Sequence, residues 1–268
     1  MNKLIFFDID GTIIEEGGSY FIPDSTLTAF DKLKENGNLL YINSGRTKSE
    51  IENRILDTFP FSGLICGCGT YIEENENVLF SRNVSLELTK SIVRDLEKYN
   101  IEWLLEGKDY IYYSTNTYKS DLEIFRKQHL ELVCDNTIIA DPEKLIAEGA
   151  FFDKFCIWLT KDSDLKSFEN IYSPYFEFID RGEGFYEIVP LGASKADGME
   201  FLMDYHNVGR DSTYAIGDST NDISMLEFAG TSICMGNGAE DAKKTVDLVT
   251  DNLRDDGLYN AFVKLGLI

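Results

Sequence analysis

The chain has 268 residues, of which 43% are hydrophobic and 27% charged, and its formal net charge is −22. This length and composition indicate a globular protein with one large or two smaller domains. The excess of carboxylates disfavours nucleic acid as a partner, and no apolar run approaches the roughly 18 residues of a membrane-spanning helix. The apolar run 4–7 is also shorter than a signal-peptide core of about 7–15 residues, so we expect a cytoplasmic protein. Five scattered cysteines, an odd number, do not indicate a disulfide framework.

The first third of the chain alternates between predicted strands and helices. Short apolar runs at 4–7, 39–42 and 63–66 are typical of buried strands. Between them the pattern predicts a helix from residue 24 to residue 36, and a second helix at 49–56. Strands that alternate with helices in this way indicate a parallel sheet.

The middle of the chain is rich in aromatic residues and lacks that alternation. Residues 73–82 have the pattern of a hairpin. The segments that follow predict helices at 86–99, 122–128 and 165–171, and strands at 102–105, 110–114, 155–159, 176–179 and 186–189. We therefore predict a separate α+β domain over residues 83–184.

The last third returns to the alternating pattern. It predicts helices at 195–205, 223–228 and 239–244, and strands at 213–216 and 231–235. The predicted fold class is α/β, with a doubly wound parallel-sheet core made of residues 1–82 and 185–268. The α+β domain 83–184 is expected to be a cap, inserted after the third strand, that closes over the strand ends and excludes water.

Polar side chains follow three of the predicted core strands. They are found at Asp8 and Asp10, at Ser44, and at 218–222, while Lys195 begins the helix after the insertion. Ligands of open parallel sheets bind beyond the carboxyl ends of the strands, so these groups are expected to converge. Several carboxylates with one ammonium and one hydroxyl suit a hard cation and a phosphoryl group. The sequence thus predicts Mg²⁺ and a small phosphorylated metabolite as ligands.

At these positions the sequence resembles the haloacid dehalogenase superfamily. The matching segments are Asp8-Ile9-Asp10-Gly11-Thr12, Asn43-Ser44-Gly45-Arg46, Lys195 and Gly217-Asp218-Ser219-Thr220-Asn221-Asp222. The segment Met235-Gly236-Asn237-Gly238 and the large insertion are similar to the Cof-type subgroup. One departure is Cys68-Gly69-Thr70, where that subgroup usually has Asn-Gly-Ala.

The resemblance implies a role for each matching residue. Asp8 would be the nucleophile that forms an aspartyl-phosphate, and Asp10 the general acid and base. The implied metal ligands are the Asp8 carboxylate, the Asp10 backbone carbonyl and Asp218, with Asp222 counted among them and also expected to orient Lys195. The phosphate would be bound by Ser44, Gly45, Arg46, Lys195 and Asn221.

Several alternatives stay open at this stage. Hydrolysis of a phosphate monoester competes with phosphomutase-type transfer to a second hydroxyl, and with phosphate binding without turnover. Arg46 either contacts substrate or pairs with an acidic side chain. Arg181, the one cation of segment 180–185, is expected to meet a second anionic group of the substrate. The substrate and the oligomeric state cannot be predicted from these residues.

Overall fold

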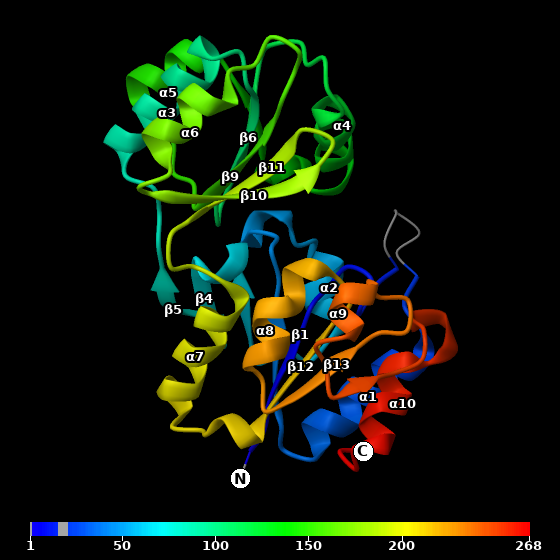
Figure 1. Ribbon diagram of the computed structural model, residues 1–268. Coiled ribbons are helices and arrows are strands. Elements are labelled where there is room, and N and C mark those ends of the chain that lie inside the picture. Colours follow the sequence, from blue (N-terminus) through cyan, green and yellow to red (C-terminus); the bar gives the residue numbers. More distant parts are fainter. Residues whose placement is uncertain (1, 16–20) are drawn as a thin grey trace. The chain divides into compact units, whose positions relative to one another are not determined.

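The computed structural model describes residues 2–15 and 21–268, which divide into two compact units. The first, here called the core unit, contains the chain up to Gly45 together with Asn53–Leu79 and Ser194–Ile268. The second, here called the inserted unit, contains Arg46–Glu52 and Phe80–Ala193. Each unit has its own sheet and its own hydrophobic core (Figure 1).

The core unit is built on a sheet in the order β14-β13-β12-β1-β2-β3-β4-β5. Strands β14 to β3 are parallel, and β4 pairs with β3 in the antiparallel direction. The central strand β1 is wholly buried, as expected for a strand covered on both faces. The strands are β1 Leu4–Phe7, β2 Leu39–Asn43, β3 Gly63–Cys66, β4 Tyr71–Glu74, β5 Asn77–Ser81, β12 Thr213–Gly217, β13 Thr231–Cys234 and β14 Leu248–Val249.

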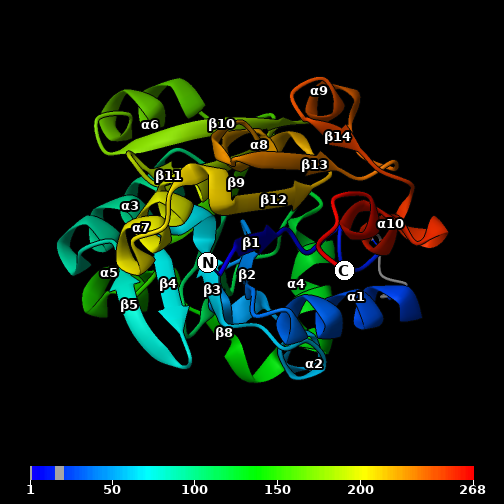
Figure 2. The same cartoon turned by 90° about the horizontal axis from the view of Figure 1, so that it is seen from below.

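Helices cover both faces of this sheet (Figure 2). On one face Leu4 and Phe6 pack in a cluster with residues of α7 (Lys195–His206) and α8 (Ile223–Phe228). On the other face the Phe7 ring lies 4.4 Å from Phe30 of α1 (Asp24–Glu35) and 5.9 Å from Phe262 of α10 (Gly257–Lys264), measured between ring centroids. Alternate residues of one strand therefore fill two cores, which is the doubly wound arrangement predicted above.

The inserted unit has a second sheet in the order β10-β11-β9-β6-β7-β8. Its pairings are antiparallel except for β7 with β8, which are parallel. Helices α3, α5 and α6 lie together against one face and α4 lies on the other (Figure 1). The elements are β6 Glu102–Glu106, β7 Ile111–Ser114, β8 Thr137–Ala140, β9 Lys154–Trp158, β10 Phe176–Gly182, β11 Phe185–Pro190, α3 Leu86–Lys98, α4 Leu122–Leu132, α5 Pro142–Glu148 and α6 Leu165–Tyr172.

The prediction of one helix over 49–56 is wrong. A 3₁₀ turn over Lys48–Glu50 is followed by extended backbone at Ile51, with φ −89° and ψ 116°, and only then by α2, Asn53–Thr58. The Thr47 backbone N–H donates to Glu50 Oε2 at 2.6 Å, and the Thr47 hydroxyl donates to the same oxygen. This local capping box fixes the start of the short turn, and the extended backbone at Ile51 separates the turn from α2, so no single helix runs over 49–56.

The predicted insertion point also needs correction. The chain leaves the core sheet after β5, because β4 and β5 extend that sheet beyond the third strand. In addition, β8, α5, β14 and α10 were not predicted. None of the helices in the described parts of the chain is sufficiently long and apolar to cross a bilayer.

Candidate active site

The polar residues after β1, β2 and β12 lie at one edge of the core sheet. Asp8 follows β1, and its backbone N–H donates to Ile216 O of the neighbouring β12 at 3.0 Å. Ser44 follows β2 and is bonded in the same manner to Ile65 O of β3 at 2.9 Å. Asp218 follows β12. Because these strands are parallel and in register, their carboxyl ends bring the side chains together.

Lys195 is the first residue of α7 and projects its ammonium into this group. The helix is capped by Ser194, whose hydroxyl oxygen accepts from Asp197 N at 3.1 Å. The Lys195 side chain is 1% exposed, and its Nζ donates to Asp8 Oδ1 at 2.7 Å and to Asp222 Oδ1 at 2.5 Å. A buried ammonium held between two carboxylates has a fixed position and stays charged.

Asp222 organises the loop that carries Asp218. Its Oδ2 accepts from the backbone N–H groups of Asp218 at 3.0 Å and Ser219 at 2.9 Å, while its Oδ1 accepts from Lys195. The fit is close: a Cβ atom on Gly217 would lie 2.5 Å from Asp222 Cγ. Both oxygens of Asp222 therefore already have donors, although the residue was also counted as a metal ligand.

Three carboxylates form a candidate metal centre within the described residues. Asp8, Asp218 and Asp222 are buried and each offers one oxygen, and these oxygens lie within 4.8 Å of one another. Three negative groups face one ammonium, so the cluster has an excess of negative charge. A set of oxygen donors with this excess fits a hard divalent cation such as Mg²⁺. The Asp10 carboxylate does not belong to this set of side-chain ligands.

The charges of the cluster shift the pKa values of its members. Burial is the largest effect, and together with the Asp222 and Asp10 carboxylates it raises the pKa of Asp8 to about 7 despite the opposing effect of Lys195. Burial alone would lower the pKa of Lys195, but Asp222 and Asp8 raise it above the usual range for lysine. Lys195 is therefore a permanent cation, and additional positive charge near Asp8 would favour its ionised form.

The other predicted phosphate-binding residues divide between the two units. Ser44 is 2% exposed and Gly45 follows it, both in the core unit. Asn221 Oδ1 lies 3.5 Å from Lys195 Nζ. Arg46 begins the stretch assigned to the inserted unit, where its Nη1 lies 3.1 Å from Glu52 Oε2. Of the two expectations for Arg46, the pairing with an acidic side chain is the one observed.

Asn43 lies in one of the matching motif segments, but the sequence predicts no role for it. It is fully buried at the end of β2, and its Nδ2 donates to the backbone oxygen of Lys195 at 3.0 Å. Its Oδ1 is among the buried side-chain atoms that lack a hydrogen-bond partner. The bond to Lys195 ties β2 to the start of α7, a contact between distant segments that no local sequence signal indicates.

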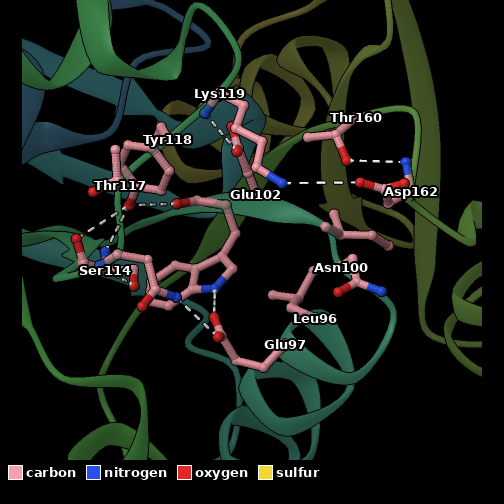
Figure 3. A pocket seen from close by; sticks show the side chains of 13 residues that line it. Leu96, Glu97, Asn100, Glu102, Ser114, Thr117, Tyr118, Lys119, Thr160 and Asp162 are labelled. Carbon is pink, nitrogen blue, oxygen red and sulfur yellow. Dashed lines mark hydrogen bonds and ion pairs between the residues drawn. The ribbon is translucent and has the colours of Figure 1, made fainter.

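The structure has a pocket in each unit, and they differ in chemistry. A cavity of about 460 Å³ in the core unit is lined by Gly11, Asp218 and Asn237, among others. A pocket of about 250 Å³ in the inserted unit contains carboxylates that are bonded to neighbouring protein groups (Figure 3). There the Trp103 indole N–H donates to Glu97 at 2.8 Å, and Glu102 accepts from Ser120 Oγ at 2.6 Å. Of these two pockets, the core-unit cavity reaches the carboxylate cluster, through Asp218.

Arg181, expected to meet a second anionic group, is bound within the inserted unit. Its Nε and Nη2 donate to Glu187 Oε2 at 3.2 Å and 2.5 Å. Its charge is thus already engaged in an ion pair.

Comparison with known proteins gives a family. A family model described as haloacid dehalogenase-like hydrolase matches residues 5–262. The chain belongs to this family. Its superfamily, its Cof-type character and its α/β fold with a cap were all predicted correctly from the motifs.

Relatives and solved structures of this family match the full length of the chain. It is 26% identical to the 5-amino-6-(5-phospho-D-ribitylamino)uracil phosphatase YitU of Bacillus subtilis, over 95% of this chain and 94% of that protein. It is 28% identical to a phosphoglycolate phosphatase of Nitrosopumilus maritimus, over 100% of this chain and 98% of that protein. A sugar phosphatase of haloacid dehalogenase subclass IIB has the same fold, with a TM-score of 0.80, 24% identity and complete coverage of both chains. Together with the family match, these relatives identify the protein as a phosphatase.

Proposed function

We propose that the protein hydrolyses a small phosphate monoester with the help of Mg²⁺, through an aspartyl-phosphate on Asp8. The observation that supports this most directly is the position of the Lys195 ammonium, which is bonded to Asp8 and Asp222 beside the Asp218 carboxylate. This arrangement combines a carboxylate nucleophile with a fixed cation that can stabilise a phosphoryl group.

The residues that would hold Mg²⁺ are the Asp8 carboxylate, Asp218 and the Asp10 backbone carbonyl. Asp222 is assigned instead to Lys195, because its two oxygens accept from that ammonium and from two backbone N–H groups. When bound, the cation supplies positive charge that offsets the repulsion between the carboxylates and an anionic substrate.

The reaction then requires two displacements at phosphorus. A carboxylate oxygen of Asp8 forms a bond to phosphorus while the bond to the ester oxygen breaks, and Asp10 donates a proton to that leaving oxygen. In the second step a water attacks phosphorus and gives a proton to Asp10, and the bond to Asp8 breaks to release inorganic phosphate. Lys195 pairs with the anionic groups in both steps, and Ser44, Gly45 and Asn221 are proposed to hold the phosphate oxygens.

A small phosphorylated metabolite is the substrate class that we propose. The two named relatives act on a phosphorylated ribitylaminouracil and on phosphoglycolate, which are both small monoesters. A protein with a net charge of −22 also disfavours polyanionic substrates such as nucleic acid.

The test is the substitution Asp8→Asn, which keeps the size of the side chain and removes the nucleophile. We expect release of inorganic phosphate from a panel of sugar phosphates, nucleotides and pyridoxal phosphate to require Mg²⁺ and to fall by a factor on the order of 10³ or more in the variant. A matched control is Asp31→Asn, an exposed aspartate of α1, which should keep full activity.

Other outcomes would favour the alternatives. Retained activity in Asp8→Asn would remove Asp8 from the reaction. An isomerised sugar phosphate without free phosphate would favour phosphotransfer, and Mg²⁺-dependent binding of the panel without turnover would favour a phosphate sensor.

A further inference from the structure

The loop that follows Asp8 has a defined conformation that orients the Asp10 carbonyl. Gly11 has a φ of +72°, a value that favours glycine, and its N–H donates to Ile14 O at 2.8 Å. The Asp10 carbonyl belongs to the same peptide group, whose C=O and N–H point in opposite directions in the trans form. The Asp10 carbonyl is therefore directed away from Ile14.

Gly11 also sets the distance between this loop and Asp218. A Cβ atom at Gly11 would lie 2.2 Å from Asp218 Oδ2, so the glycine backbone packs directly against that carboxylate. The Thr12 hydroxyl lies 3.4 Å from Asp218 Oδ1. A small movement of Gly11 would change the spacing between two groups that we assign to the metal, the Asp10 carbonyl and Asp218.

Asn237 connects this loop to the C-terminal part of the core unit through both ends of its amide. Its Nδ2 donates to Gly11 O at 2.8 Å, and its Oδ1 accepts from Leu253 N at 2.8 Å. The turn that carries Asn237 is itself fixed to the Asp218 loop, because Ala239 N donates to Asp218 O at 2.6 Å. The Asn237 side chain thus links Gly11 to a segment that is bonded to the Asp218 loop, in addition to the contact of Thr12 with Asp218.

We propose that Asn237 is a positioning residue for the divalent cation, acting through Gly11 to hold the Asp10 carbonyl and Asp218 at the spacing that the ion needs. This role rests on the proposed function, because it assumes a cation at these groups. Preorganised ligands bind an ion more tightly, since the ordering of the loop has been completed before binding.

The experiment measures Mg²⁺ binding to the complete protein by calorimetry, apart from any turnover. We expect Asn237→Ala to weaken Mg²⁺ binding about three- to ten-fold, the effect of one or two lost hydrogen bonds. At saturating Mg²⁺ the Michaelis constant for the best substrate should change less than about two-fold, while the Mg²⁺ concentration for half-maximal rate should rise in parallel with the binding constant. The melting temperature without Mg²⁺ should stay close to that of the parent.

Asn237→Asp separates positioning from charge. The aspartate keeps the oxygen that accepts from Leu253 N but cannot donate to Gly11 O when ionised, and it adds a negative charge. Positioning predicts weaker Mg²⁺ binding in this variant as well, whereas a purely electrostatic effect predicts tighter binding. The control is Asn260→Ala, which removes an exposed asparagine that donates to Asp251 in the same C-terminal segment.

Three outcomes would overturn the assignment of Asn237 and leave the proposed function intact. They are unchanged Mg²⁺ binding in Asn237→Ala, tighter Mg²⁺ binding in Asn237→Asp, or a loss of Mg²⁺ binding in Asn260→Ala equal to that in Asn237→Ala. A clear fall in the melting temperature of Asn237→Ala without Mg²⁺, together with the weaker binding, would show that Asn237 has a general structural role instead. A parent protein that binds no Mg²⁺ would overturn both proposals.

Discussion

Each unit contains a buried lysine between two carboxylates, and the two sites differ in their balance of charge. Lys195 of the core unit bonds to Asp8 and Asp222, and its side chain is 1% exposed. Lys154 of the inserted unit lies 2.6 Å from Glu106 and 2.9 Å from Glu187, and its side chain is 4% exposed. Local contacts alone do not distinguish the two lysines.

The surrounding charges do distinguish them. Beside Lys195 a third carboxylate, Asp218, completes an excess of negative charge that a divalent cation can neutralise. Beside Lys154 a second cation, Arg181, pairs with Glu187, so two cations face Glu106 and Glu187, and Glu50 also acts on Glu106. A buried ion cluster that contains more than one cation of its own is typical of a structural role, whereas one with a single cation among several carboxylates at strand ends is a candidate for ligand binding.

The largest expected effect is on activity, from Lys195→Met. The variant removes the fixed cation that stabilises the phosphoryl group, so turnover should fall by a factor on the order of 10³, or about 4 kcal/mol of transition-state stabilisation. The chain should still fold, because Asp8 can take up a proton in its buried position. Phosphate release and circular dichroism measure the two properties. A variant that keeps a tenth or more of the parent activity would contradict the catalytic role of Lys195.

The next effect is on stability, from Lys154→Met. Removing this cation leaves Glu106 buried without its partner, and should cost about 3 kcal/mol of unfolding free energy. Both tryptophans, Trp103 and Trp158, lie in the inserted unit, so their fluorescence follows the unfolding of that unit in urea. Turnover of a generic aryl phosphate should stay within about three-fold. Lost activity with unchanged stability would place Lys154 in the functional site and contradict the distinction between the two lysines.

The smallest effect is a pH dependence within the inserted unit, tested with Glu106→Gln. Burial and the nearby Glu50 raise the pKa of Glu106 to about 8. A carboxyl with a pKa higher in the folded than in the unfolded protein loses its stabilising contribution as pH rises from about 4.5 to 8. The parent should therefore lose roughly 2 kcal/mol relative to Glu106→Gln between pH 6 and pH 8, measured by urea unfolding.

Glu187→Gln is the matched control for that titration. Burial acts to raise the pKa of Glu187, but the charges of Lys154 and Arg181 prevail and hold it at about 2. This carboxyl is ionised in both states above pH 5, so the difference in stability between Glu187→Gln and the parent should not change between pH 5 and pH 8. If the stability difference from the parent changed equally with pH in both variants, Glu106 and Glu187 would not be distinguished by their surroundings.

The motif residues and the core strands could be predicted from the sequence because their signals are local. An apolar run that ends in Asp8, or in Asp218, marks both a buried strand and the position of its carboxyl end. The contacts of Lys195 with Asp8 and Asp222 follow once the parallel order of the strands is known. The bond of Asn43 to the Lys195 backbone depends on tertiary packing and has no local signal.

The elements that were missed depend on distant contacts. The strand β8 is only partly buried and is defined by parallel pairing with β7, from which α4 separates it along the chain. The helix α10 begins at Gly257, a poor helix former, after Asp256 in a left-handed conformation. It is held by Phe262, which packs on Phe7. In the same way, the ion pair of Arg46 with Glu52 could not be read from a helical pattern.

The order of strands in the core sheet also has a consequence for how the protein acquires its activity during synthesis. β1 lies between β2 and β12, so its second neighbour is translated only after the whole inserted unit. Pairing over such a distance along the chain is slow to form, and domains made earlier can fold first. A nascent chain therefore carries Asp8 long before Lys195 and Asp218 exist. We expect newly made protein to become an active phosphatase only in its last folding step, when β12 pairs with β1.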